Sequence, residues 1–269
     1  MIEAVDLSER IGSEVRSGAD EILTPEGAAE LRALLIRRGV LVFRQLGFTD
    51  EQQVRLAGLL GTVRAEGKDG IHKITLDTKV SATAEYLKGS FLWHMDGTHD
   101  DVPVFASLLT GRKLSAVGGR TWFANSYAAY EELPQDFKDR IENLKVLHSF
   151  ETSMQRAEVE PTPANVAYWR SIPNRTHNLV WKHGSGRKSL VIGCHASHVV
   201  GMDRAESDAL IAELIDWVTQ PRFTYGHDWT VGDMLIWDNT GVLHRVDPYP
   251  LESGRMMHRT TLVGEEAFA

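Results

Sequence analysis

Residues 234–263 read MLIWDNTGVLHRVDPYPLESGRMMHRTTLV, and this stretch decides the fold class. Three short runs, at residues 234–237, 242–246 and 256–263, are rich in the large apolar and β-branched residues that favour strands. Turn-forming groups separate them, Asp-Asn-Thr-Gly in the first gap and a Pro- and Gly-containing segment in the second. Short strands joined by tight turns are typical of an all-β barrel or sandwich.

The same pattern extends back to about residue 105. Glycine turns separate further strand-like runs, which lie at residues 105–109, 120–124, 177–182, 189–192 and 223–229. Two helical regions interrupt these runs: residues 126–143, broken at Pro134, and residues 205–219, with one apolar face. Eight short strands in total predict a jelly roll.

Helix signals dominate the N-terminal part of the chain. Thr24 and Pro25 are suited to begin a helix that Gly39 ends, and Thr49 with Gln52 forms a capping box. The expected helices flank a strand-like run at residues 40–43, and the second of them covers residues 50–60.

Taken together, these patterns predict one domain over residues 1–269, mainly β with flanking helices. It comprises a helical flank at 1–65 and a jelly-roll core at 90–265 with helical insertions. Residues 154–173 have few periodic signals, and we expect a long loop that covers a site.

Composition excludes several classes of protein. The chain has 29 basic and 37 acidic residues and no basic block that would follow a phosphate backbone, so we expect no nucleic-acid partner. No secretory signal or membrane-length apolar stretch is visible, which predicts a soluble, cytoplasmic protein without a membrane partner. Cys194 is the single cysteine, which excludes an intrachain disulfide, and we interpret it as a buried small residue.

The candidate chemistry begins with His94 and Asp96, two positions apart in Trp-His-Met-Asp-Gly. On an extended strand such residues point to the same side, so both can reach one metal ion. This pattern alone is common by chance, but His244 adds a second imidazole on another strand-like run. Two histidines and one carboxylate are the facial set that holds Fe(II) with open positions. A closed zinc site would use four ligands, usually several thiolates, and this chain has one cysteine in place of a cysteine-rich set.

Two further residues suit a dicarboxylic 2-oxo acid that chelates the metal. Arg255 stands where the strand after His244 turns back, so its guanidinium can face the same cavity and bind a carboxylate. Thr121 can add a hydroxyl to that carboxylate.

On these residues the chain resembles the taurine dioxygenase and aryloxyalkanoate dioxygenase (TauD/TfdA) family of Fe(II)/2-oxoglutarate-dependent dioxygenases. The resemblance covers about residues 10–265 and has the family's order of motifs. These are Trp93-His94-Met95-Asp96, Gly118-Gly119-Arg120-Thr121 leading into Ala128-Ala129-Tyr130-Glu131, Gly186-Arg187-Lys188-Ser189-Leu190, Trp237-Asp238-Asn239, His244, and Arg255-Met256-Met257-His258-Arg259-Thr260-Thr261.

The resemblance implies a double-stranded β-helix with Fe(II) on His94, Asp96 and His244, and with 2-oxoglutarate on Thr121 and Arg255; O2 is the other cosubstrate. It implies hydroxylation of a small organic acid, with the acid group on Arg259, and a homodimer or homotetramer is common in the family. A salt bridge at a strand end is the alternative interpretation of Arg259. The weaker candidates for the substrate pocket are Tyr86, Phe91, Trp181 and His72.

The leading substrate class is an aryloxyalkanoate or other hydrophobic carboxylate, ahead of an alkylsulfonate or sulfate ester. Hydroxylation next to an oxygen or sulfonate would release the leaving group and cleave the substrate. Two alternatives from other classes stay open on the residues alone: a cupin-type metal enzyme that needs no 2-oxoglutarate, and a catalytically silent sensor of a small acid.

Overall fold

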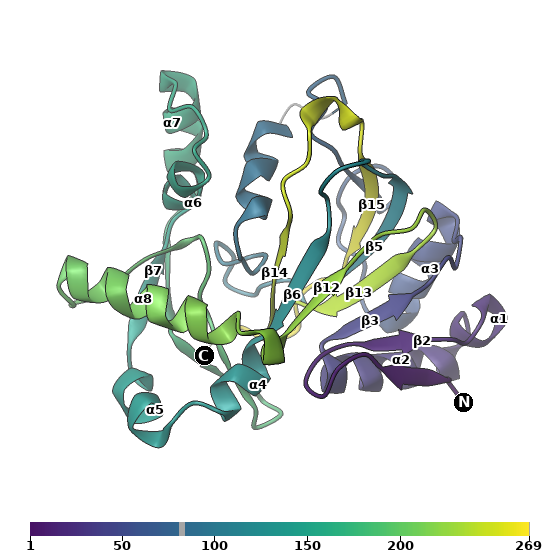
Figure 1. The fold of residues 1–269 in the computed structure, drawn as a ribbon, viewed down its shortest axis with the longest axis horizontal. Helices are drawn as coiled ribbons and strands as arrows, with labels where there is room; N and C mark the ends of the chain where they lie inside the picture. The colour runs from purple at the N-terminus through teal and green to yellow at the C-terminus, as the bar shows by residue number, and fades with distance from the viewer. Residues whose placement is uncertain (81–83, 269) are drawn as a thin grey trace.

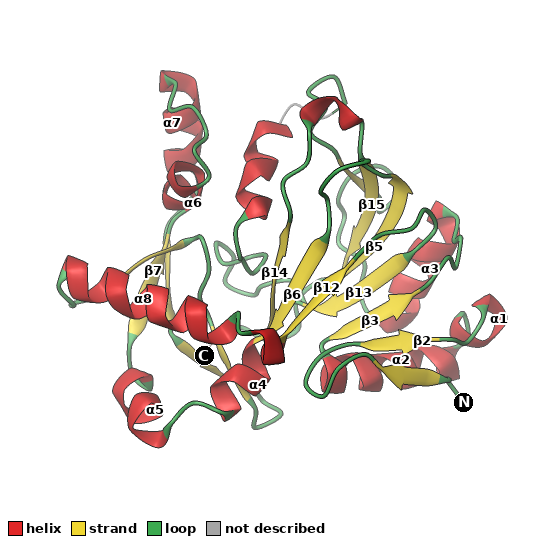
Figure 2. Ribbon diagram, in the orientation of Figure 1, coloured by secondary structure: helices red, strands yellow, loops and turns green. Residues whose placement is uncertain are grey.

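The computed structural model describes residues 1–80 and 84–268. Strands occupy the centre of the molecule and helices lie around them (Figure 1 and Figure 2). The largest sheet has seven strands, which are, in order across the sheet, β1 (Ala4–Asp6), β2 (Ser13–Val15), β3 (Val40–Phe43), β13 (Met234–Asp238), β5 (Ala106–Lys113), β15 (Met256–Thr261) and β4 (His72–Ile74).

Three smaller sheets complete the β structure. The sheet that contributes to the site has the order β12 (Thr224–His227), β6 (Thr121–Asn125) and β14 (Val242–Val246). The other two sheets contain β11 (Ala196–Val199), β7 (Lys145–His148) and β8 (Arg175–Asn178), and β10 (Lys188–Leu190) with β9 (Val180–Lys182).

The described helices are mostly short. They are α1 (Ala19–Ile22), α2 (Pro25–Arg38), α3 (Asp50–Leu60), α4 (Ser126–Glu131), α5 (Gln135–Ile141), α6 (Phe150–Arg156), α7 (Pro163–Ser171) and α8 (Arg204–Val218), with 3-10 helices η1 (Ala84–Phe91), η2 (Pro221–Phe223) and η3 (Leu251–Ser253).

Alternation along the central strands builds two cores from one sheet. On β3, Leu41 and Phe43 pack with the apolar residues of α2 and α3. Val40 and Val42 face the interior between the seven-stranded sheet and the β12-β6-β14 sheet. Successive side chains on a strand point to opposite faces, so one fully apolar run serves both cores. Phe123 of β6 lies in the second core, which joins the seven-stranded sheet to the β12-β6-β14 sheet.

The predicted jelly-roll class is confirmed, and most predicted elements occur near their expected positions. Helix α3 begins at a capping box in which the Thr49 side chain accepts a hydrogen bond from the Gln52 backbone. The predicted strand at residues 177–182 is in fact two strands, β8 and β9. The strands β1, β2, β4, β7 and β11 were not expected from the sequence.

One prediction about residues 154–173 is wrong. The segment is largely helical: the end of α6 and all of α7 lie within it. Thr162 caps α7 by accepting a hydrogen bond from the Asn165 backbone, and Pro163 occupies the first helical position. Only Asn165 and Trp169 of α7 are buried, so the helix has little apolar periodicity to reveal it.

No helix among residues 1–80 and 84–268 is long and apolar enough to cross a membrane.

Candidate active site

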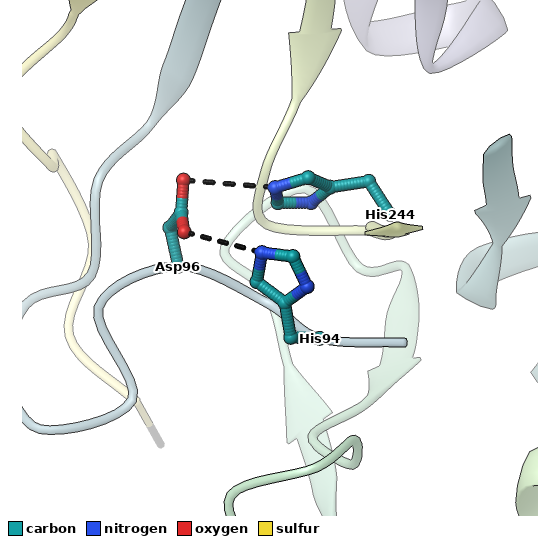
Figure 3. Close-up of side chains that lie close together, drawn as sticks. All are labelled: His94, Asp96 and His244. Carbon is teal, nitrogen blue, oxygen red and sulfur yellow. Dashed lines mark ion pairs between the residues drawn. The ribbon is translucent and has the colours of Figure 1, made fainter. Parts of the chain in front are cut away.

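The side chains of His94, Asp96 and His244 converge on one point, and Figure 3 shows the carboxylate facing both imidazoles. The His94 Nε2 atom lies 3.7 Å from Asp96 Oδ1, and the His244 Nε2 atom lies 3.7 Å from Asp96 Oδ2. All three ligand atoms are within 4.8 Å of one another. They are therefore close enough to share a single ion.

The backbone fixes the two histidines against each other. His94 and His244 exchange both of their backbone hydrogen bonds in an isolated antiparallel bridge, at 3.0 and 2.9 Å. His94 Nδ1 also lies 2.8 Å from the Leu92 carbonyl oxygen. A carbonyl can only accept, so Nδ1 donates its proton to Leu92, and this bond orients the ring with Nε2 toward the carboxylate.

The backbone of Asp96 is held by a side chain and not by strand pairing. The sequence predicted an extended strand through His94 and Asp96, but only His94 makes a β-bridge and Asp96 begins a turn. The Asn239 side chain fixes the Asp96 backbone instead: Asn239 Oδ1 accepts from the Asp96 N–H at 2.9 Å, and Asn239 Nδ2 donates to the Asp96 carbonyl at 2.9 Å. Asn239 therefore positions the carboxylate.

The protonation states suit metal binding. Burial lowers the pKa of His244 to about 3, so this imidazole is neutral at pH 7 with a lone pair to donate. Burial alone would raise the pKa of Asp96, but the neighbouring His244 and Arg259 outweigh burial and keep that pKa below its usual range. A neutral His244, an ionised Asp96 and the second imidazole of His94 together make two histidines and one carboxylate, a donor set that fits Fe(II).

A cavity of about 80 Å³ lies beside the two histidines. Its wall combines apolar side chains with hydroxyl groups and three arginines. The lining residues are Ile74, Leu87, Ser90, His94, Leu109, Thr121, Trp237, His244, Arg245, Val246, Arg255 and Arg259.

Arg255 is the buried cation of this cavity. Its side chain packs over the Tyr249 ring at 4.7 Å, and its Nη2 donates to the Gly119 carbonyl oxygen at 3.3 Å. Gly119 has a φ of +80°, and a Cβ there would lie 3.0 Å from Arg255 Nε, so glycine leaves room for the guanidinium. Within residues 1–80 and 84–268, no carboxylate lies within 4.0 Å of Arg255. A buried, uncompensated guanidinium fits a site for a ligand carboxylate.

Thr121 also lines the cavity, and its hydroxyl oxygen accepts one hydrogen bond from the protein. The indole Nε1 of Trp229 donates to Thr121 Oγ1 at 2.9 Å. Because the hydroxyl oxygen already accepts one hydrogen bond, its own proton remains available to donate to an anion. Trp229 was not identified as part of this site from the sequence, because it lies 108 positions away from Thr121.

Arg259 occupies the other end of this wall. Its Nη1 lies 3.3 Å from Asp96 Oδ2, and its Nη2 lies 3.8 Å from Glu66 Oε2. His72 stands directly opposite Arg259 on the neighbouring strand β4. Burial lowers the pKa of His72, and the charge of Arg259 lowers it further.

The three aromatic candidates lie in different surroundings. Tyr86 stacks on Tyr168 of α7, with ring centroids 5.0 Å apart, so it links η1 to α7. Phe91 packs edge to face on Tyr249, and the guanidinium of Arg255 also packs over the Tyr249 ring. Trp181 is fully buried and packs on the ring of Phe268, outside the set of cavity-lining residues.

Cys194 is buried, as expected from its status as the single cysteine. Burial raises the pKa of its thiol to about 12, so the thiol is not ionised at pH 7.

His148 gives a prediction for acid stability. The side chain is fully buried, neither ring nitrogen has a hydrogen-bond partner among the described residues, and burial lowers its pKa to about 3. In the unfolded chain, His148 takes up a proton near pH 6.5, whereas in the folded protein it stays neutral down to about pH 3. Protonation therefore favours the unfolded chain: the stability of the folded protein is unaffected by His148 above pH 6.5 and decreases as the pH falls from 6.5 toward 3. From pH 6.5 to 4.5 we expect this residue to cost about 2 kcal/mol in the free energy of unfolding.

Urea denaturation at several pH values checks this. His148→Phe keeps an apolar ring without the titration, so its unfolding free energy should fall less between pH 6.5 and 4.5 than that of the unmodified protein. An equal loss of unfolding free energy between pH 6.5 and 4.5 in the two proteins would contradict the low pKa of His148.

The chain is similar to known dioxygenases over most of its length. Residues 3–261 match the model of the family described as "Taurine catabolism dioxygenase TauD, TfdA family". The chain is 34% identical to the alpha-ketoglutarate-dependent 2,4-dichlorophenoxyacetate dioxygenase of Burkholderia sp. (strain RASC), covering 90% of this chain and 87% of that protein. It is 33% identical to the (S)-phenoxypropionate/alpha-ketoglutarate-dioxygenase of Sphingobium herbicidovorans, covering 91% and 89%.

A solved structure is similar to this chain over its whole length. The crystal structure of AAD-2 in complex with Mn(II) and N-oxalylglycine matches with a TM-score of 0.86 and 30% identity, covering 100% of both chains. The family match spans nearly the whole chain, and the converging His, Asp and His side chains lie within it. The chain therefore belongs to the TauD/TfdA family of Fe(II)- and 2-oxoglutarate-dependent dioxygenases.

Proposed function

We propose that His94, Asp96 and His244 hold Fe(II), that Arg255 and Thr121 bind the distal carboxylate of 2-oxoglutarate, and that the substrate is a small organic acid whose acid group lies on Arg259. The uncompensated charge of Arg255 carries the proposal. This guanidinium is buried in the same small cavity as the two histidines, which is where a dicarboxylic cosubstrate would neutralise it.

Each residue has a defined task in this proposal. Arg255 supplies a guanidinium and Thr121 a hydroxyl proton to the far carboxylate, which orients the 2-oxo acid toward the histidines. The apolar part of the wall, including Leu109 and Val246, limits water around the reacting atoms. Fe(II), with 2-oxoglutarate and O2 bound, supplies the oxidising chemistry that hydroxylates a substrate C–H bond.

For the substrate we propose an aryloxyalkanoate or another hydrophobic carboxylate, ahead of an alkylsulfonate or sulfate ester. Arg259 is 23% exposed and lies 3.3 Å from Asp96, so an acid group on it would hold the rest of the substrate near the metal ligands. The two relatives named above, which act on a dichlorophenoxyacetate and a phenoxypropionate, support this order. Hydroxylation beside the ether oxygen would cleave such a substrate and release a phenol.

Substrate-dependent succinate formation tests the substrate class. Fe(II)-loaded protein would receive 2-oxoglutarate, O2 and one of four compounds: phenoxyacetate, an alkyl sulfate, an alkylsulfonate, or the uncharged analogue phenoxyethanol. We expect the highest kcat/KM for phenoxyacetate, with about one phenol released per succinate, and at least a tenfold lower value for phenoxyethanol because it lacks the charge-assisted bond to Arg259. A higher kcat/KM for the sulfur compounds or for phenoxyethanol would contradict the proposed order.

The single-domain organisation also remains a proposal. It is supported by the seven-stranded sheet, in which β1 and β15 from the two ends of the chain take part. The cytoplasmic location and the homo-oligomeric state remain predictions from the sequence.

A further inference from the structure

Glu66 belongs to a chain of alternating charges that ends at the metal-binding carboxylate. Arg259 lies between Asp96, at 3.3 Å, and Glu66, at 3.8 Å. Arg64 lies between Glu66, at 3.0 Å, and Asp100, at 3.3 Å. These five residues are called the charge chain below.

The position of Glu66 is fixed from a second side. Thr261 donates its hydroxyl proton to Glu66 Oε2 at 3.2 Å, and Thr261 lies two residues beyond Arg259 on β15. The backbone N–H of Arg64 donates to the Thr261 carbonyl at 2.8 Å, which holds the Glu66 segment along this strand. The carboxylate of Glu66 is therefore tied to the strand that carries Arg259.

Arg259 consequently has a resident carboxylate at the place where a substrate acid would bind. Its Nη1 faces Asp96, its Nη2 faces Glu66, and its buried Nε has no hydrogen-bond partner among the described residues. His72, opposite Arg259, is held neutral by burial and by the charge of Arg259, so it adds no positive charge. An anionic head group on Arg259 must share the guanidinium with Glu66, and like charges this close repel each other.

We propose that Glu66 is a specificity-determining residue that competes with the substrate's acid group for Arg259 and lowers the affinity of the site for anionic relative to uncharged head groups. This inference rests on the proposed function, in which Arg259 receives the acid group. A site built this way binds a monoanionic acid with moderate affinity and disfavours a head group with two negative charges.

A purely structural role of Glu66 makes a different prediction. If Glu66 only braced Arg259 and Thr261, its replacement would loosen the pocket for charged and uncharged ligands alike. If Glu66 competes for Arg259, replacement would strengthen the binding of the acid alone. The ratio of the two affinities separates the two roles.

The experiment is isothermal titration calorimetry on full-length protein loaded with Mn(II) and N-oxalylglycine, which allow binding without turnover. The probes are phenoxyacetate and its uncharged counterpart phenoxyacetamide. Glu66→Gln removes the charge while its amide oxygen can still accept from Thr261. The matched control is Asp100→Asn, which removes a carboxylate from the same charge chain at a position that contacts Arg64 instead of Arg259.

We expect Glu66→Gln to lower the Kd of phenoxyacetate at least fivefold and to change that of phenoxyacetamide less than twofold, whereas Asp100→Asn changes neither by more than twofold. Glu66→Ala, which removes the charge without the amide, should show the same direction if Glu66→Gln folds poorly. An unchanged ratio of the two Kd values in both Glu66 variants would overturn the role of Glu66 alone. Failure of phenoxyacetate to bind the unmodified protein at millimolar concentration would overturn the proposed substrate class together with this inference.

Discussion

Replacing His94 by alanine is expected to reduce iron-dependent turnover of 2-oxoglutarate by about a thousandfold or more. Among residues 1–80 and 84–268, three ligand atoms converge on the proposed metal position, and the variant removes one of them. A bound metal ion supplies several kcal/mol of stabilisation to the reacting groups, and about 4 kcal/mol corresponds to a thousandfold change in rate. Succinate formation under saturating Fe(II), 2-oxoglutarate and O2 measures the effect.

A second histidine provides the matched control. His198 lies on β11 and is not among the residues that line the cavity. His198→Ala should retain at least half of the turnover, and its Fe(II) affinity should equal that of the unmodified protein. Equal activity of His94→Ala and His198→Ala would remove His94 from the metal site.

Replacing Arg255 by glutamine is expected to raise the KM for 2-oxoglutarate about 100-fold while kcat changes only severalfold. The reason is the loss of the proposed charge-assisted, bidentate contact to the distal carboxylate; such a contact contributes about 1.5–3 kcal/mol. Steady-state succinate formation over a range of 2-oxoglutarate concentrations gives both constants. Lysine at this position should not rescue the KM, because its single ammonium lacks the planar fork of the guanidinium.

Two controls separate this role from a general loss of the cavity. Arg245 lines the same cavity but is paired with Asp247 at 2.8 Å, so Arg245→Gln should leave the KM for 2-oxoglutarate within about threefold. For 2-oxobutyrate, which lacks the distal carboxylate, the Arg255 variant and the unmodified protein should have similar KM values. A large penalty with 2-oxobutyrate would show that Arg255 has another task.

The parts of the fold that follow from local chemistry were predictable. The capping box at Thr49 and Gln52 predicted where α3 begins, and the apolar run at residues 40–43 predicted the strand β3. These signals lie within a few residues of the element that they specify. The five unexpected strands are three or four residues long, too short for alternation to stand out in the sequence.

The error at residues 154–173 has a specific physical cause. Helix α7 carries a cap and a first-turn proline, at Thr162 and Pro163, and both are visible in the sequence. The helix nevertheless buries only two of its side chains, so the periodic apolar signal that identifies most helices is weak. The cap and the proline were the better guides here.

The candidate site was predictable in its residue types but not in its supports. The His-X-Asp motif, His244, Thr121 and Arg255 were identified from sequence and lie around one cavity or its edge. Their supports come from positions far away in the chain: Asn239 is 143 residues from Asp96, and Arg259 near the end of the chain pairs with Glu66 in its first third. No local pattern encodes such contacts, because the tertiary fold alone brings these residues together.

The proposed function is tested most directly on the unmodified protein, by the ratio of succinate formed to O2 consumed after Fe(II) is added to metal-free protein with 2-oxoglutarate and phenoxyacetate. The proposed function predicts no turnover before Fe(II) is added, one succinate formed per O2 consumed afterwards, and no activity when Zn(II) replaces Fe(II). Conversion of phenoxyacetate without 2-oxoglutarate or O2, or no succinate in the presence of Fe(II), would contradict it.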